Sequence, residues 1–213
     1  FYPISVLEKD LILEECKKIK IDGITTIATD ICIPTISYVA EKLNLIANSY
    51  NSSIVSTNKL EMRKCFSKAK LNSPKFIALK ELEVSLMEKF EFPLIVKPTD
   101  RSGSRGVNKV LNLNELKKAF KIALDESIEK RVIIEEFIEG FEVSVESISS
   151  KGVHNVLSIT DKITTNDPYF VELEHHQPTK LNGILQEKII TETLKALDAL
   201  NIRYGAGHTE LKI

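Results

Sequence analysis

Hydrophobic positions recur along the chain with two spacings, one typical of helices and the other of strands. In residues 113–128 the apolar side chains fall three or four positions apart, on one face of a predicted amphipathic helix. Residues 141–149 instead alternate, so that Phe141, Val143 and Val145 face one side of a predicted strand and polar side chains face the other. The chain therefore contains both helices and strands, each with one face for a core.

The same two spacings, together with turn residues, predict the remaining elements. Further strands are expected at 24–29, 75–79, 94–97, 107–111, 132–138, 153–163 and 206–213. Further helices are expected at 34–43, 54–70, 81–90 and 184–200. The cluster Asn51-Ser52-Ser53 interrupts the pattern and indicates the end of a subdomain.

The order of these elements divides the chain into three parts. Strand 24–29 and the helix after it form the kind of unit found in a parallel α/β sheet, which assigns residues 1–55 to an α/β part. Strands and helices are more segregated in residues 56–131 and 132–213, as in α+β domains. The predicted fold class is therefore α/β followed by α+β.

Composition narrows the classes of function. The net charge of -1 gives no support for binding nucleic acid or an acidic membrane. No apolar run approaches the roughly 18 residues of a membrane span, and no signal peptide is visible. The three cysteines, Cys16, Cys32 and Cys65, have no metal-ligand spacing and are expected to be free thiols in a reducing compartment, which indicates the cytoplasm.

A Gly-rich loop at 100–106 carries the first candidate chemistry. Gly103 and Gly106 allow backbone angles that let N–H groups point at a phosphate, although a plain hairpin turn explains such a loop equally well. No Lys-Ser/Thr follows the glycines, so the loop is not a Walker A motif. Lys97, just before the loop, is a natural partner for a phosphate, whereas Lys59 taken alone reads as part of a solvated helix face.

Acidic residues form the other candidate groups. Glu135 and Glu136 end a strand that looks buried, which indicates a nucleotide-binding hinge or a tight turn with charged ends. Glu210 would be a hard oxygen ligand for Mg²⁺ if it faced a nucleotide. His208 shares its face of the strand and is expected to be a packed core histidine rather than a metal ligand. His175-His176 lacks a zinc-spaced partner and is expected in a loop.

Five segments, in this order, resemble the ATP-grasp superfamily: NKLEMR (58–63), FPLIVKP (92–98), DRSGSRGV (100–107), IIEEFIEGFEVSVE (133–146) and GHTELK (207–212). The resemblance covers nearly the whole chain. It implies two α+β subdomains that sandwich ATP, at 56–131 and 132–213. Residues 1–55 would then be the end of a preceding Rossmann-like pre-ATP-grasp domain.

The resemblance also implies a role for each matching position. Lys59 and Lys97 match two phosphate-contacting lysines and would be the catalytic residues. The lid over the phosphates would be formed by Ser102, Gly103, Ser104 and Gly106. The remaining nucleotide contacts would come from Glu135 near the adenine amino group, Glu136, Phe137 and Ile138 along the adenine edge, and Glu142 at the ribose. Glu210 matches the first metal ligand.

The activity implied by this resemblance is that of an ATP-dependent ligase. Such enzymes use ATP and Mg²⁺, or Mn²⁺, to activate a carboxylate as an acyl-phosphate, which an amine or similar nucleophile then attacks. Residues 164–172, with His175 and Pro178, are similar to amino-acid ligases and carbamoyl-phosphate-synthase-like proteins, so a small carboxylate such as an amino acid is the expected substrate. Many relatives are dimers, and a homodimer is compatible with the resemblance.

One departure from the superfamily pattern leaves an alternative function open. The superfamily pattern continues beyond Glu210 to a Glu-x-Asn that the sequence does not contain, so we expect truncation at both ends and little activity from residues 1–213 alone. A non-catalytic ATP-binding module of the same fold is therefore the alternative. A nicotinamide-dependent dehydrogenase is disfavoured, because DICIP at 30–34 is not a Gly-rich turn.

Overall fold

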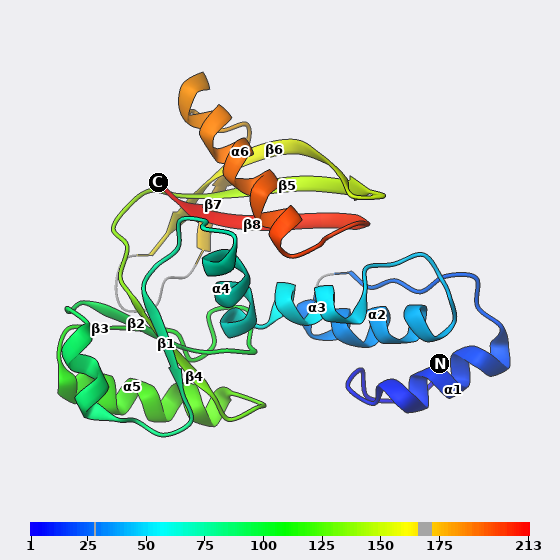
Figure 1. The fold of residues 1–213 in the computed structure, drawn as a ribbon, viewed down its shortest axis with the longest axis horizontal. Coiled ribbons are helices and arrows are strands. Elements are labelled where there is room, and N and C mark those ends of the chain that lie inside the picture. The colour runs from blue at the N-terminus through cyan, green and yellow to red at the C-terminus, as the bar shows by residue number, and fades with distance from the viewer. Residues whose placement is uncertain (28, 166–171) are drawn as a thin grey trace.

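The N-terminal part of the chain is helical in the computed structural model, which describes residues 1–27, 29–165 and 172–213. Its elements are α1 (Lys9–Ile19), the 3₁₀ turn η1 (Asp30–Cys32), α2 (Ile33–Lys42) and α3 (Tyr50–Thr57). Leu13 and Cys16 of α1 pack on Val39 of α2. Figure 1 shows these helices together, to one side of two sheets that the rest of the chain forms.

The helix expected at 34–43 is confirmed as α2, with Pro34 in its first turn, where its missing N–H costs nothing. The strand expected at 24–29 is wrong for the described residues, since 24–27 and 29 have no regular structure; residue 28 lies outside them. A strand needs a hydrogen-bonded neighbour, and no other strand occurs in the described residues before β1. The Rossmann-like assignment of residues 1–55 therefore stays a prediction.

The break expected at 51–53 is also wrong, because these residues lie inside α3. Ser49 caps this helix by accepting a hydrogen bond from the N–H of Ser52. The single helix expected at 54–70 is divided by Asn58, whose extended backbone ends α3 and whose side chain accepts hydrogen bonds from the first turn of α4 (Lys59–Lys68). Capping by Asn58 thus outweighs the continuous helical pattern.

The first sheet is antiparallel and has the strand order β1-β4-β2-β3. Its strands are β1 (Phe76–Leu79), β2 (Leu94–Pro98), β3 (Asn108–Val110) and β4 (Val132–Glu136). The helix expected at 81–90 is the 3₁₀ helix η2 (Val84–Lys89), and α5 (Leu113–Glu126) follows β3. Because β4 belongs to this sheet, the two sheets divide after Glu136, later than the predicted boundary between 131 and 132.

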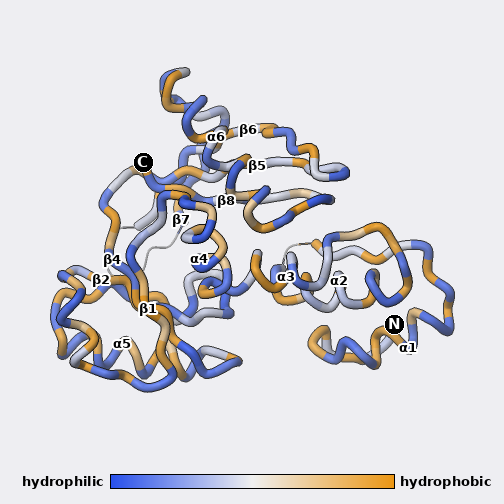
Figure 2. The backbone as a smooth tube through the Cα atoms, viewed as in Figure 1, coloured by the Kyte–Doolittle hydropathy of each residue, from blue (hydrophilic) through white to orange (hydrophobic). Residues whose placement is uncertain are grey.

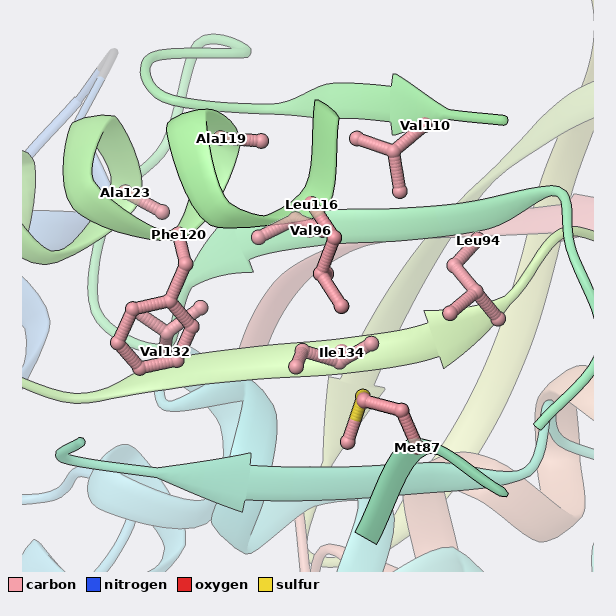
Figure 3. Close-up of a cluster of buried hydrophobic side chains, with 10 residues drawn as sticks. All are labelled: Met87, Leu94, Val96, Val110, Leu116, Ala119, Phe120, Ala123, Val132 and Ile134. Carbon is pink, nitrogen blue, oxygen red and sulfur yellow. The ribbon is translucent and has the colours of Figure 1, made fainter. Parts of the chain in front are cut away.

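Helix α5 covers one face of the first sheet, as its spacing predicts. Asn112 caps it by accepting from the N–H of Glu115. Figure 2 shows that hydrophobic and hydrophilic positions both recur along α5, as expected for an amphipathic helix. Figure 3 shows the buried core between helix and strands: Met87, Leu94, Val96, Val110, Leu116, Ala119, Phe120, Ala123, Val132 and Ile134. The strand residues that alternate with these face the other way, and they include Lys97 and Glu135.

The second sheet is also antiparallel, with the order β7-β6-β5-β8. Its strands are β5 (Glu142–Ser150), β6 (Val153–Thr164), β7 (Glu172–His176) and β8 (Gly205–Lys212), and α6 (Gly183–Ala199) packs on it. The loop expected at His175-His176 is wrong, because both residues lie on β7. The two antiparallel sheets, each covered by a helix, confirm the predicted α+β class for this part of the chain.

Alternation along β5 gives the second sheet two different faces. Val143 and Val145 join Ile159 of β6 and Ile189 of α6 in a second core. The intervening residues of β5 face away from α6, toward the polar side of the sheet. In the described parts of the chain, no helix has the length and apolar character needed to cross a membrane.

Candidate functional site

A buried carboxylate, that of Glu135, organises the polar face of the first sheet. Its two oxygens accept from Lys97 Nζ and from Arg63 Nε, both at 2.6 Å. Lys97 and Glu135 share this face because β2 and β4 pair in antiparallel register, while Arg63 reaches it from α4. Burial by itself would raise the pKa of Glu135, but the neighbouring Lys97 and Arg63 charges outweigh it and hold that pKa below its usual range.

Lys59 lies one helical turn before Arg63 and faces the same cluster. The N–H of Lys59 donates to the Thr99 carbonyl at 2.7 Å, which ties the start of α4 to the end of β2. Its ammonium donates to the carbonyl of Arg101, where the Gly-rich loop begins. Burial lowers the pKa of Lys59, and the nearby Lys97 charge lowers it further. In the described chain no carboxylate forms an ion pair with Lys59, so this cluster is suited to receiving an anion.

The Gly-rich loop has the backbone that its sequence indicates. Gly103, Ser104 and Gly106 all adopt positive φ angles. A Cβ atom at Gly106 would lie 3.1 Å from Pro98 Cγ, so a larger residue would strain this turn. Three loop residues, Ser102, Gly103 and Arg105, also border a hollow of about 510 Å³. Its other lining residues are Thr26, Ile27, Thr29, Asp30 and Ile33. The structure therefore brings Lys59, Lys97 and the start of the loop together.

A second cluster lies on the polar face of the second sheet, around Lys162. The Lys162 Nζ atom is 2.5 Å from Glu210, 2.6 Å from Glu172 and 3.2 Å from Glu142. Burial alone would lower the pKa of Lys162, but the hydrogen bonds to Glu172 and Glu210 raise it above its usual value. Lys162, which was assigned no role from the sequence, thus joins Glu142 and Glu210, which the resemblance assigned to the nucleotide and metal site.

The structure corrects the prediction that His208 is a packed core histidine. Its side chain is half-exposed rather than packed in a core, and its Nδ1 atom lies 2.8 Å from Glu146. The imidazole helps, with Lys162, to lower the pKa of Glu210 to about 2. The carboxylates of Glu210, 3.6 Å from Nε2, and of Glu146 outweigh burial and raise the pKa of His208 itself to about 9. His208 therefore belongs to the polar face that carries Glu210.

Phe137 connects the two polar faces. Lys109 of β3 lies 4.0 Å from the centre of its ring and Lys212 of β8 lies 4.9 Å from it. Lys212 also donates to the Ile138 carbonyl at 3.2 Å. The N–H of Glu136 already donates to the Lys75 carbonyl, so pairing with a base would use other backbone atoms. The segment that was predicted to meet adenine therefore lies between the two sheets.

No individual role was assigned to Arg63, Lys162 or Glu172 from the sequence. Arg63 lies four residues after Lys59, which puts both on one helix face, and this spacing was the available signal for Arg63. Lys162 lies near the end of the strand predicted at 153–163, where no local signal marks it out. Only the pairing of β6 with both β5 and β7 shows that it is buried.

The ion pairs of Glu135 predict a specific acid dependence of stability. Since its folded pKa is lower than the usual value of 4.5, the carboxylate stabilises the fold above about pH 4.5, and this contribution is lost as pH falls through the lowered pKa. We expect the difference in unfolding free energy between wild type and Glu135→Gln to be largest near pH 6 and to shrink toward pH 3. Urea unfolding across this range measures it, and a difference independent of pH would contradict the assignment.

Comparison with known proteins agrees with this geometry. The ATP-grasp domain family matches residues 90–213. The chain is 28% identical to the alanine–anticapsin ligase of Bacillus subtilis over 216 residues, which is 90% of this chain and 45% of that protein. It is 32% identical to a D-alanine–D-alanine ligase of Flavobacterium johnsoniae over 124 residues, covering 55% of this chain and 38% of that protein.

A solved structure resembles the whole fold. The L-amino acid ligase from Bacillus licheniformis superimposes with a TM-score of 0.85 at 28% identity, covering 99% of this chain and 51% of that one. The chain thus spans about half the length of these ligases. The matched family covers both the Gly-rich loop and the strand that carries Glu210. This chain belongs to the ATP-grasp family.

Proposed function

We propose that this chain is the nucleotide-binding part of an ATP- and Mg²⁺-dependent ligase that activates a carboxylate, as an acyl-phosphate, for attack by an amine or a similar nucleophile. The observation that carries the proposal is the convergence of Lys59, Lys97 and the start of the Gly-rich loop at the polar face of the first sheet. Phe137 connects this face to the acidic face with Glu142 and Glu210 on the second sheet. A nucleoside triphosphate suits both faces, because its phosphates match the cations of the first sheet, while its ribose and the metal ion match the carboxylates of the second.

In this proposal the basic cluster binds phosphate oxygens. Lys59 is partly buried close to Lys97 and forms no ion pair with a carboxylate in the described chain, so an anion would stabilise its ammonium. Backbone N–H groups of Ser102, Gly103, Ser104 and Gly106 would add donors. Such fixed positive groups stabilise the charge that spreads over the phosphoryl group during transfer. We assign the base to the segment from Glu136 through Phe137 to Ile138, and the ribose to Glu142.

The metal would be held by Glu210 together with the phosphates. The described residues contain no group of three side chains arranged as a metal cage. Mg²⁺ commonly binds through one or two carboxylates plus substrate phosphates, and Mn²⁺ has similar preferences. The low pKa of Glu210, about 2, keeps it ionised and suited to such a role. The metal, when bound, would supply positive charge at the reacting phosphate.

The substrate assignment rests on the relatives. The named relatives join alanine to anticapsin and D-alanine to D-alanine, so we propose an amino acid as the carboxylate substrate. Of the segment 164–172 that suggested this from sequence, residues 166–171 lie outside the described chain, whereas Glu172 and His175 lie on β7 beside Lys162. A division into three domains, with the second limit after Glu136 where the two sheets divide, and a homodimer remain proposals.

A phosphate-release screen tests the proposal. Purified full-length protein is incubated with ATP, Mg²⁺ and pooled amino acids, and then with pairs from the active pools. We expect ADP and phosphate to form only when a carboxylate substrate is present, and to stop when EDTA removes the metal. Nucleotide binding without substrate-dependent turnover would instead support the non-catalytic module.

A further inference from the structure

Lys162 occupies an unusual position for a lysine. It lies on β6, which is hydrogen-bonded to β5 and β7, and its side chain is only 2% exposed. Its Nζ atom contacts carboxylates from three other strands: Glu142 of β5, Glu172 of β7 and Glu210 of β8. None of the roles argued so far uses this residue, although two of its partners belong to the proposed nucleotide site.

The carboxylates form an open group above a buried cation. Glu172 and Glu210 keep about half of their side-chain surface exposed, at 50% and 52%, while Lys162 lies beneath them. Three carboxylates this close repel one another unless a cation lies between them. Carboxylate oxygens are also the ligands that divalent cations prefer. The ammonium therefore supplies the positive charge that a divalent cation could otherwise bring to these carboxylates.

We propose that Lys162 is a built-in counter-cation of the nucleotide site, which holds Glu142, Glu172 and Glu210 together in the nucleotide-free protein and keeps a free divalent cation out. The proposal rests on the proposed function for the roles of Glu142 and Glu210. A free metal ion meets a cluster that Lys162 already neutralises in part. A metal ion that arrives with ATP brings phosphate ligands of its own, so the metal enters together with the nucleotide.

Replacing the lysine tests this directly. In Lys162→Met the side chain keeps its length but loses its charge, so the three carboxylates become available to a cation. We expect Mn²⁺ to bind this variant at least tenfold more tightly than wild type in the absence of nucleotide, as measured by electron paramagnetic resonance titration of free Mn²⁺. A purely structural lysine would not produce a gain in metal affinity.

Two controls accompany the variant. Lys162→Arg retains the charge and is expected to bind Mn²⁺ as weakly as wild type. Lys195→Met removes a lysine that pairs with Glu192 at 2.7 Å on the exposed side of α6, and it should also leave Mn²⁺ affinity unchanged. Double replacement, Lys162→Met with Glu172→Gln, removes one of the three ligands and should reverse most of the gain.

Folding of the variant is followed in the same experiment. If Lys162→Met is unstable because its carboxylates repel, added Mn²⁺ must raise its Tm more than that of wild type. Equal Mn²⁺ affinity in folded Lys162→Met and wild type, or an unstable variant that Mn²⁺ does not stabilise, would overturn the proposal. Because no nucleotide or substrate is present, failure of the ligase assay leaves this measurement intact, and the two proposals fail separately.

Discussion

Glu135→Ala will lower the free energy of unfolding by about 3 kcal/mol or more, within the range of about 3–5 kcal/mol for breaking a buried ion pair. The carboxylate is 3% exposed and is the shared partner of Lys97 and Arg63. Removing it leaves two largely buried cations facing each other and takes away one of the carboxylates that offset the charge of Lys59. Urea unfolding at pH 7 measures the loss of stability. This loss arises from tertiary contacts, because neither α4 nor β4 needs the Glu135 side chain for its local structure.

Glu136→Ala is the matched control for this variant. Glu136 is the next residue of the same strand, and its carboxylate accepts one exposed hydrogen bond, from the N–H of Lys75 at 2.9 Å. Loss of one such bond should cost about 1 kcal/mol or less. Similar losses in the two variants would show that Glu135 does not act as the counter-charge of the basic cluster.

Lys97→Met will weaken the binding of ATP or ADP at least tenfold, which corresponds to about 1.4 kcal/mol. The reason is the loss of a positive charge whose neighbours are Lys59 and the start of the Gly-rich loop, where we place the phosphates. Methionine keeps most of the aliphatic stem, so packing changes less than with alanine. Isothermal titration calorimetry with and without Mg²⁺ measures the affinity.

Lys75→Met controls for the general loss of a lysine. Lys75 precedes β1, donates to the Lys89 carbonyl and lies over the Phe90 ring, outside the proposed site. Its hydrogen bonds to Glu136, in the proposed base-binding segment, use only its backbone, so replacing the side chain should leave nucleotide affinity unchanged. The thermal unfolding of Lys97→Met must also be recorded, because Arg63 remains as the partner of Glu135 and should keep the variant folded. A folded Lys97→Met with wild-type affinity would remove the basic cluster from the nucleotide site.

Most elements with a clear local signal were predictable. Helix α5 and strands β2 and β5 lie close to where periodicity places them, because each has one face buried in a core. Strand β8 also lies where it was expected, with one face partly buried. The α3–α4 break was missed, and the helix predicted at 81–90 is a shorter 3₁₀ helix, since single caps and short 3₁₀ turns leave little periodic signal. Strand β7 was missed as well, because its residues are mostly exposed and carry no alternation.

The residues of the candidate site likewise fall into those that were predictable from local sequence and those that were not. Lys97, the Gly-rich loop and Glu210 stand out locally, since each interrupts or ends a regular pattern, and the resemblance supplied their expected roles. The partners of these residues did not stand out. Arg63 and Glu135 are 72 residues apart and Lys162 and Glu210 are 48 apart, so only pairing across the chain brings them into contact.

By itself, the sequence determined which faces of its helices and strands are apolar, where the chain turns, and which side chains can meet a phosphate or a metal. The tertiary structure decided which strands pair, which charges are buried, and that a lysine rather than solvent lies beneath the carboxylates of the second sheet. Periodicity is a property of neighbouring residues, whereas ion pairs and sheet edges depend on segments that are distant in the chain.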